Sequence, residues 1–227
     1  CAPISDDEIV DKLKEQNKIM NERSFLNIRA FNRKHMSIIS KSQIKRSALV
    51  KATINLVNNN GFHAAPMSKI AKTAGISPGT IHLYFENKQD MINQVYIEVK
   101  AAYTRFAFKD YKASFSVAEG FENIWKNIAE FKLKEVEEAM FLSQCDNTPM
   151  VDEASRQEGL KHLRPLLDLW ERGQKEGIIK PVSPYLLYTF SIYPIAFMMN
   201  TQQQQHLKLT PEQINEAYNM AWNSIKN

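Results

Sequence analysis

Apolar residues recur three and four positions apart along almost the whole of the 227-residue chain. This spacing places them on one face of an α-helix, whereas a half-buried strand would alternate apolar and polar residues. Stretches of alternating β-branched residues are scarce, and the chain contains only seven glycines. The pattern therefore predicts an all-α protein.

Helix start and stop signals divide this pattern into separate predicted helices. Gly61 is expected to end the first helix in a left-handed conformation, and Ser77 to cap the third, with Pro78 at its first position. Thr210 and Gln213 form a capping box for the last. After residue 40 the predicted helices are Ser42–Asn60, Pro66–Ala74, Ser77–Phe85, Asn87–Phe108, Val117–Asp146 with a break near Leu133, Asp152–Gly177, Ser183–Gln203 and Pro211–Lys226.

Positive charge is concentrated in one segment of the chain. The formal net charge is +4 overall, but the segment from Lys41 to Asp90 has seven Lys or Arg and two Asp or Glu, a net of +5. Residues 116–227 have 11 basic and 15 acidic residues, a net of −4. A localised basic segment is what a phosphate-binding surface requires, although a solvated lysine-rich face would give the same count.

The reactive residues do not favour an enzyme. The five histidines, at positions 35, 63, 82, 162 and 206, are scattered along the sequence. We find no Ser/His/acid arrangement, no metal-ligand spacing and no glycine-rich phosphate loop, so we predict no catalytic residues, no metal and no cofactor. Two cysteines, Cys1 and Cys145, offer no disulfide framework, and no apolar run reaches membrane-span length. We expect a cytoplasmic protein without a membrane partner.

The segment Met67–Lys88 has the sequence of a helix-turn-helix. Gly75 can adopt the positive φ that a tight turn between two helices requires, and Ala71 is small enough for the helices to approach there. A small core is expected from Ile70, Ala74, Ile76 and Ile81. The second helix then presents its N-terminal residues outward, as a recognition helix presents them to base edges in the major groove.

This segment resembles the DNA-binding domain of the TetR/AcrR family of transcriptional regulators. The resemblance rests on Ile70-Ala71, Ala74-Gly75-Ile76-Ser77, Gly79-Thr80-Ile81, Tyr84-Phe85, and Asn87-Lys88 followed by Asp90. It covers about residues 40–100, including the preceding helix, and beyond them it is only architectural. The sequence departs from the family pattern at two positions, with Pro66 in place of a common threonine and His82 in place of a common tyrosine.

The resemblance implies an N-terminal three-helix helix-turn-helix domain, residues 36–90, and a C-terminal helical domain for ligand binding and dimerisation, residues 91–227. The partner is then a double-stranded DNA operator. Lys88 resembles a lysine that pairs with phosphate at a helix N-terminus. Carried over by position, the DNA-binding residues are Ser68, Lys69, Ser77, Pro78, Gly79, Thr80, His82, Tyr84 and Lys88. Phe85 and Ile81 are expected in the core.

An effector pocket is implied between the helices of the C-terminal domain. Aromatic and methionine side chains suit a lipophilic or planar small molecule, although close-packed core is an alternative for each of them. The candidate lining residues are Trp125, Phe131, Met140, Phe141, Trp170, Tyr188 and Met198.

The family also implies a homodimer, joined through about residues 183–226. The apolar residues expected there are Leu187, Phe190, Ile195, Met199, Ile214, Ala217, Met220, Ala221 and Trp222. Two recognition helices would then lie about 34 Å apart, one turn of DNA. Ligand binding is expected to shift the helix that begins near Lys88, change the spacing of the two heads and release a repressor from its operator.

Residues 1–35 precede this architecture and include a predicted helix from about Ser5 to Arg23. We interpret them as an extension, either non-native or an unusual native arm, with Met36 as the natural start. For the whole chain, the alternative to a DNA-binding repressor is a helical interaction protein whose head does not bind DNA.

Overall fold

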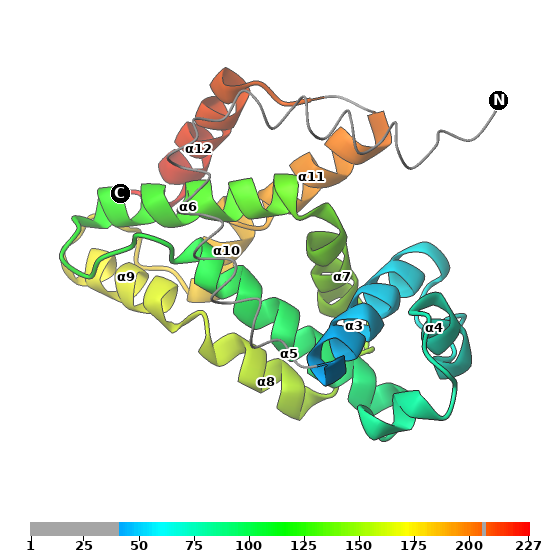
Figure 1. The fold of residues 1–227 in the computed structure, drawn as a ribbon. Helices are drawn as coiled ribbons and strands as arrows, with labels where there is room; N and C mark the ends of the chain where they lie inside the picture. The colour runs from blue at the N-terminus through cyan, green and yellow to red at the C-terminus, as the bar shows by residue number, and fades with distance from the viewer. Residues whose placement is uncertain (1–40, 206–207) are drawn as a thin grey trace, which may run out of the picture. The chain divides into compact units, whose positions relative to one another are not determined.

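The computed structural model describes residues 41–205 and 208–227, which form helices and a single isolated β-bridge (Figure 1). The prediction of an all-α fold is confirmed. By packing, the chain divides into residues 1–47 and a compact unit of residues 48–227. The helix predicted within residues 1–35 lies outside the described residues.

The helix-turn-helix is built as the sequence predicts, except for its second helix. Helices α3 (Lys41–Asn60) and α4 (Met67–Thr73) precede a short 3₁₀ helix, η1 (Thr80–Leu83). Gly61 and Gly75 adopt φ angles of 76° and 68°, the left-handed conformation expected at these two turns. Ile70, Ala71 and Ile81 are fully buried and form the core of this head, with Phe85 beside them.

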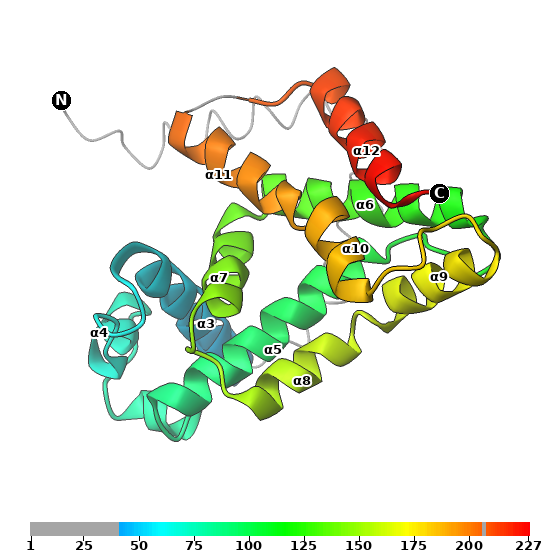
Figure 2. The same ribbon diagram turned by 180° about the vertical axis from the view of Figure 1, so that it is seen from behind.

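Helix α5 (Lys88–Ala107) is the central element of the compact unit. It packs against α6 (Val117–Lys134), α7 (Val136–Asn147) and α8 (Glu153–Lys161), as Figures 1 and 2 show from opposite sides. The break between α6 and α7 falls at Glu135, which confirms the predicted interruption near Leu133. The proposed domain boundary at residue 90 lies inside α5, so the two proposed domains share this helix.

The remaining helices are α9 (Arg164–Lys175), α10 (Pro184–Ser191), α11 (Pro194–Gln205) and α12 (Pro211–Ile225). Helix α10 packs on α12, and both α11 and α12 pack on α6. The buried Trp125 of α6 donates a hydrogen bond from Nε1 to the Ser191 carbonyl oxygen at 2.8 Å. At the C-terminus, the β-bridge between Ile179 and Lys226 fixes the loop after α9.

Two helices predicted as continuous are each divided in two. The predicted helix Asp152–Gly177 is interrupted at His162 and Leu163, and the predicted helix Ser183–Gln203 at Ile192 and Tyr193. In both cases a proline follows, Pro165 or Pro194, which has no N–H to donate and whose ring clashes with the carbonyl four residues earlier. The Phe190 carbonyl that Pro194 leaves free accepts a hydrogen bond from Ser224 Oγ at 3.3 Å.

The packing around Gly173 gives a test of this arrangement. A Cβ at Gly173 would lie 2.7 Å from Ile179 Cδ1 and 2.8 Å from Val117 Cγ1, and both neighbours are fully buried. We therefore expect Gly173→Ala to lower the free energy of unfolding by about 1–3 kcal/mol, because the core must move to admit the methyl group. Urea unfolding at a fixed protein concentration measures the change.

Gly79→Ala is the matched control. Gly79 has a φ of −74°, and nothing lies within 4 Å of the Cβ that alanine would add. This variant should unfold within about 0.5 kcal/mol of the wild type. Equal unfolding midpoints for the Gly173 and Gly79 variants would contradict the packing described here.

Candidate nucleic-acid interface and effector cavity

The segment from Ser77 to Leu83 is the exposed element of the head. The predicted helix Ser77–Phe85 is wrong in type and extent, because only Thr80–Leu83 is helical and this part is 3₁₀. Ser77 does not cap a helix through its side chain. Its hydroxyl pairs with the Thr80 hydroxyl at 2.6 Å, and its carbonyl accepts from the Thr80 amide at 2.9 Å. Gly79 within the first turn disfavours a regular helix, since glycine loses more backbone entropy than other residues.

Burial divides the recognition segment into an inner and an outer face. Ile81 and Phe85 are buried, as expected, and Thr80 and Tyr84 are half-buried. Ser77, Pro78, Gly79 and His82 are exposed, so four of the residues carried over by position are accessible to DNA. Leu83 is 82% exposed and was missed by the sequence analysis. It could have been found from the spacing, because Ile81 and Phe85 on the inner face turn residues 82 and 83 outward.

A basic groove lies beside this segment. It is lined by Ser68, Lys69, Lys72, Ile76 and Pro78. Both lysines are exposed, and Lys69 Nζ donates only a long hydrogen bond of 3.4 Å to Asn60 Oδ1. Lys72 was counted in the basic segment but was not among the predicted contacts. Exposed ammonium groups at the side of an exposed recognition element are suited to phosphate oxygens.

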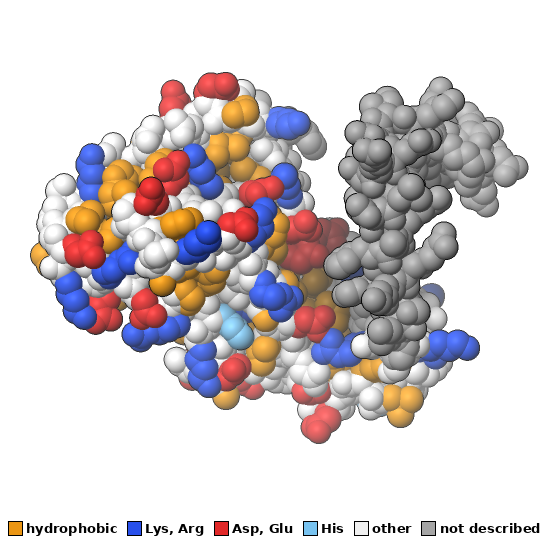
Figure 3. Space-filling view, turned by 60° about the vertical axis from the view of Figure 1, so that its left-hand side comes forward, with side chains coloured by type: hydrophobic (Ala, Val, Ile, Leu, Met, Phe, Trp, Pro, Cys, Tyr) orange, Lys and Arg blue, Asp and Glu red, His pale blue; other side chains and the backbone are white. Residues whose placement is uncertain are grey.

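Elsewhere on the described surface the charges are mixed. Figure 3 shows acidic and basic side chains interspersed over one face. Several lysines and arginines of the described helices form ion pairs one helical turn apart, such as Lys134 with Glu130 at 2.6 Å. Phosphate attraction is therefore expected at the head rather than over the remaining helices.

Lys88 and Asn87 fix the start of α5 next to the head. Asn87 Oδ1 caps the helix by accepting a hydrogen bond from the Asp90 amide at 2.9 Å. Lys88 Nζ lies 4.2 Å from the centroid of the Phe62 ring and donates to the His63 carbonyl oxygen at 3.3 Å. Partial burial lowers the pKa of the Lys88 ammonium. In this conformation Lys88 ties α5 to the turn after α3.

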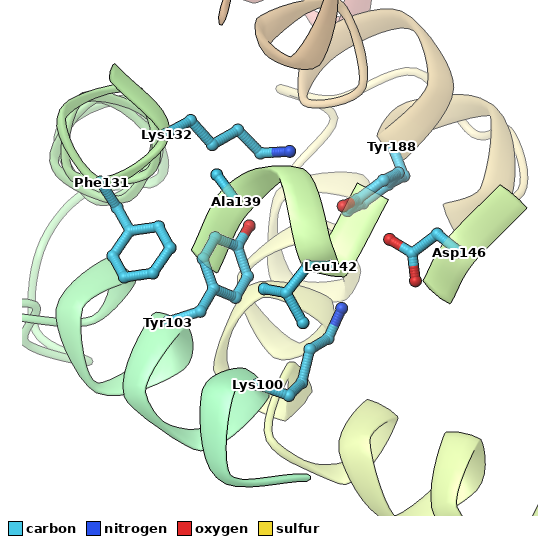
Figure 4. A pocket seen from close by; sticks show the side chains of 8 residues that line it. All are labelled: Lys100, Tyr103, Phe131, Lys132, Ala139, Leu142, Asp146 and Tyr188. Atoms are coloured by element: carbon cyan, nitrogen blue, oxygen red, sulfur yellow. The ribbon is translucent and has the colours of Figure 1, made fainter. Parts of the chain in front are cut away.

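A cavity with two parts opens among α5, α6, α7 and α10. The inner chamber is narrow, with about 260 Å³ of space between its atoms when the part open to solvent is included. It is lined by Lys100, Tyr103, Phe131, Lys132, Ala139, Leu142, Asp146 and Tyr188 (Figure 4). The outer cleft encloses about 1420 Å³, its open mouth included, and is lined largely by Leu160, Leu163, Leu167, Trp170, Tyr185 and Tyr193. Lys100, Asp146 and Tyr188 line both parts, so the two adjoin at these side chains.

The chamber is lined by charged and hydroxyl groups, although apolar side chains surround it. In Figure 4 the ammonium groups of Lys100 and Lys132 and the Tyr188 hydroxyl point toward a common space. Desolvation, and then repulsion from Lys100, lower the pKa of Lys132 to about 8, while Asp146 acts in the opposite direction. Burial raises the pKa of both tyrosines, Tyr103 and Tyr188, so both are neutral hydroxyls at physiological pH.

The seven candidate pocket residues predicted from the sequence fall into three groups. Phe131, Trp170 and Tyr188 line the cavity. Trp125 and Phe141 are buried in the core, and Met140 and Met198 are partly buried outside this lining. The two lysines and Asp146 were missed, because each is one charged residue on its own helix and no sequence spacing relates them.

The described residues include no cluster suited to a metal ion. Among residues 41–205 and 208–227, no three His, Cys, Asp or Glu side chains are grouped to hold a metal ion. Burial raises the pKa of the Cys145 thiol to about 12, so it carries almost no thiolate at neutral pH. No helix in the described part of the chain is long and apolar enough to cross a membrane.

Sequence and structural comparisons agree with this geometry. Residues 49–95 match the family described as bacterial regulatory proteins, tetR family, and residues 117–226 match the tetracyclin repressor-like C-terminal domain. An uncharacterised helix-turn-helix transcriptional regulator of Haemophilus influenzae is 25% identical over 179 residues, which are 78% of this chain and 94% of that protein.

Two solved structures extend the comparison to the whole fold. A TetR family transcription regulator from Marinobacter aquaeolei VT8 has a TM-score of 0.77 and 27% identity, over 82% of this chain and 98% of that one. FadR from Bacillus subtilis, solved in complex with stearoyl-CoA, has a TM-score of 0.61 and 20% identity, over 79% and 97% of the two chains. The fold and its exposed head define a helix-turn-helix transcriptional regulator. This chain belongs to the TetR family of DNA-binding regulators.

The cap at Asn87 sets the position of α5 and can be tested alone. We expect Asn87→Ala to lower the free energy of unfolding by about 1 kcal/mol, because the Asp90 amide loses its side-chain acceptor. Asn87→Ser keeps an acceptor of similar reach and should stay within a few tenths of a kcal/mol of the wild type. Urea unfolding compares the two, and an equal loss in both variants would show that the cap contributes little.

Proposed function

We propose that the chain is a homodimeric repressor that binds operator DNA through the head and is released by a lipophilic small molecule. The observation that carries this proposal is the course of α5, which begins beside the head at Lys88 and lines the cavity with Lys100 and Tyr103. Lys100 follows Lys88 by 12 residues, or about 18 Å along the helix. A ligand that displaces α5 at the cavity would therefore move the end that Lys88 ties to the head.

Helix α7 supplies a second connection between the cavity and the head. Asn58, near the end of α3, donates from Nδ2 to the Glu137 carbonyl oxygen at 2.9 Å. Its Oδ1 accepts from Gln144 Nε2 at 3.3 Å. The same helix contributes Leu142 and Asp146 to the cavity. Two helices that touch both regions support a population shift between a DNA-binding and a released arrangement.

A lipophilic effector is supported by the outer cleft, in which leucine and aromatic side chains prevail. FadR from Bacillus subtilis shares this fold at a level of identity that shows the fold alone, and its structure holds stearoyl-CoA. That complex illustrates a lipophilic ligand on a fold of this kind.

Dimerisation is supported by an exposed apolar surface on α10, α11 and α12. Leu187, Ile195, Met199 and Ala221, which the sequence suggested for the dimer contact, are already buried in the chain's own core. The large apolar side chains that remain exposed there and do not line the cleft are Leu186, Phe190, Phe197 and Met220, and Phe197 and Met220 are each 74% exposed. Exposed apolar side chains on neighbouring helices are typical of an interaction site. We propose that this surface joins two copies within residues 183–226.

Binding to DNA is tested with 30-base-pair duplexes selected by the wild-type protein from a randomised library. Lys69→Gln should weaken binding to every duplex and reduce the slope of log affinity against log salt by about 1, because one phosphate contact is lost. His82→Ala should instead relax discrimination at one or two base pairs by about 1–3 kcal/mol, with the slope unchanged. Fluorescence anisotropy at several salt concentrations measures both.

Lys134→Gln is the control, since Lys134 is an exposed, ion-paired lysine of α6 away from the head. It should leave both readouts unchanged. Failure of the wild-type protein to enrich any duplex would favour the alternative, a helical interaction protein with a head that does not bind DNA.

The dimer contact is tested by sedimentation velocity at micromolar concentration. The wild type should sediment as a dimer, and Phe197→Glu as a monomer, because a carboxylate would be buried in an apolar contact. Leu83→Glu, a matched change at an exposed leucine of the head, should remain dimeric. A dimer in all three proteins would place the contact elsewhere.

A further inference from the structure

The cavity contains a buried cation without a partner. Lys100 is only 4% exposed, yet its ammonium group makes no ion pair or hydrogen bond within residues 41–205 and 208–227. Its Nζ lies 5.5 Å from the centroid of the Tyr103 ring. A buried charge is normally paired, because removing it from water without compensation costs several kcal/mol. Packing alone gives no reason for a lysine at this position.

Other donors around the same cavity also lack acceptors. The Tyr103 hydroxyl is buried beside Tyr188 without a hydrogen bond of normal geometry to any described residue. The indole Nε1 of Trp170, which lines the outer cleft, is likewise unsatisfied. Native proteins leave few buried polar groups unpaired, and each instance calls for an explanation such as a missing ligand. The lining thus has an excess of donors.

The charge at the inner end is positive overall. Lys100 of α5 and Lys132 of α6 converge on the chamber, and Asp146 of α7 is the one carboxylate that lines it. Lys132, like Lys100, has no ion pair or hydrogen bond recorded within the described chain. Two ammonium groups against one carboxylate leave one positive charge uncompensated. The group that completes this chamber is therefore an anion.

The shape of the cavity limits what this anion can be. The chamber is narrow and admits only a compact head group, whereas the larger and mostly apolar cleft continues past Leu163, Leu167 and Trp170. A compact anionic head with an apolar body matches both parts. A head as large as a nucleotide exceeds the chamber.

We propose that the cavity binds an amphipathic carboxylic acid, with its carboxylate between Lys100 and Lys132 and its apolar chain along the outer cleft. The carboxylate accepts hydrogen bonds from the two ammonium groups and the Tyr103 hydroxyl, which satisfies donors that the protein leaves unpaired. That such an acid acts as the effector rests on the proposed function, whereas the binding itself does not.

The binding is tested by isothermal titration calorimetry of the full chain with sodium octanoate and sodium dodecanoate, each below its micellar concentration. At least one acid should bind saturably, with one site per chain. The alcohols of equal length, 1-octanol and 1-dodecanol, should bind at least tenfold more weakly, because they bring no charge to the lysines.

Lys100→Met and Lys132→Met should each weaken acid binding at least tenfold and bring the affinities of acid and alcohol closer together. Lys134→Met, on the same helix as Lys132 but exposed and paired with Glu130, is the matched control and should bind as the wild type does.

Because Lys100→Met removes an uncompensated buried charge, its melting temperature without ligand should equal or exceed that of the wild type. A loss of binding in a more stable protein cannot be ascribed to unfolding.

The pH dependence gives a further readout. Affinity for the acid should fall roughly tenfold between pH 7.5 and 9.5, since Lys132 loses its proton over this range and the acid stays ionised throughout. The other groups facing Lys132 are Lys100 and Tyr103 of α5, Asp146 of α7 and Tyr188 of α10. Burial raises the pKa of both tyrosines, so they remain neutral in this window. Lys132→Met should flatten the profile.

Acid binding and DNA release are measured separately, so that their failures are distinguishable. Equal binding of acids and alcohols, or unchanged acid affinity in both lysine variants, overturns the inference and leaves the DNA-binding proposal intact. Absence of binding by either acid also overturns it. If the acid binds and both lysines are needed, but the selected duplex stays bound to the protein, the site is supported and the acid is not the effector.

Discussion

The burial of α5 is the constraint on which the rest of the structure depends. Met91, Ile92 and Val95 are fully buried, Val99 and Tyr103 nearly so, and α6, α7 and α8 all pack on this one helix. Its first turn is held by the Asn87 cap and by Lys88 against Phe62 and His63. Close-packed surroundings resist bending of a helix this buried. Under the proposed function, α5 would therefore couple the cavity to the head.

The same helix carries a buried lysine, Lys100, which is 4% exposed. Thr53, Thr104 and Ser191 are also buried, but their hydroxyls donate to main-chain carbonyls within their own helices. Lys100 has no such acceptor among the described residues, and the neighbouring Tyr103 hydroxyl interacts with the Tyr188 hydroxyl without a hydrogen bond of normal geometry. Where most buried polar groups are satisfied locally, an unpaired lysine at a cavity is consistent with the proposed ligand site.

The surface proposed to bind DNA and the surface proposed to join two copies of the chain differ in charge. The head concentrates basic residues around an exposed recognition segment, whereas the other helices pair their lysines with glutamates one turn away. Isolated ammonium groups attract phosphate over a distance of about one Debye length, while paired ones present little net field. The apolar surface of α10, α11 and α12 is correspondingly suited to a second protein chain rather than to DNA.

Sequence alone determined the features that depend on a few neighbouring residues. The turns at Gly61 and Gly75, the capping box at Thr210, and the inward positions of Ile81 and Phe85 follow from local conformational preferences, and all are present. The same reasoning placed two helices across Pro165 and Pro194, where the periodic apolar pattern continues although the backbone hydrogen bonding cannot. It also predicted a longer and more regular recognition helix than the 3₁₀ turn at Thr80–Leu83.

Tertiary structure alone decided which charged side chains line the cavity. Phe131, Trp170 and Tyr188 were foreseen as lining residues because aromatic side chains are recognisable candidates in any sequence. Lys100, Lys132 and Asp146 come from three different helices, and each would pass for an ordinary solvated charge on its own. Their convergence depends on the rotation and crossing of α5, α6 and α7, which packing of the whole core fixes and no local pattern encodes.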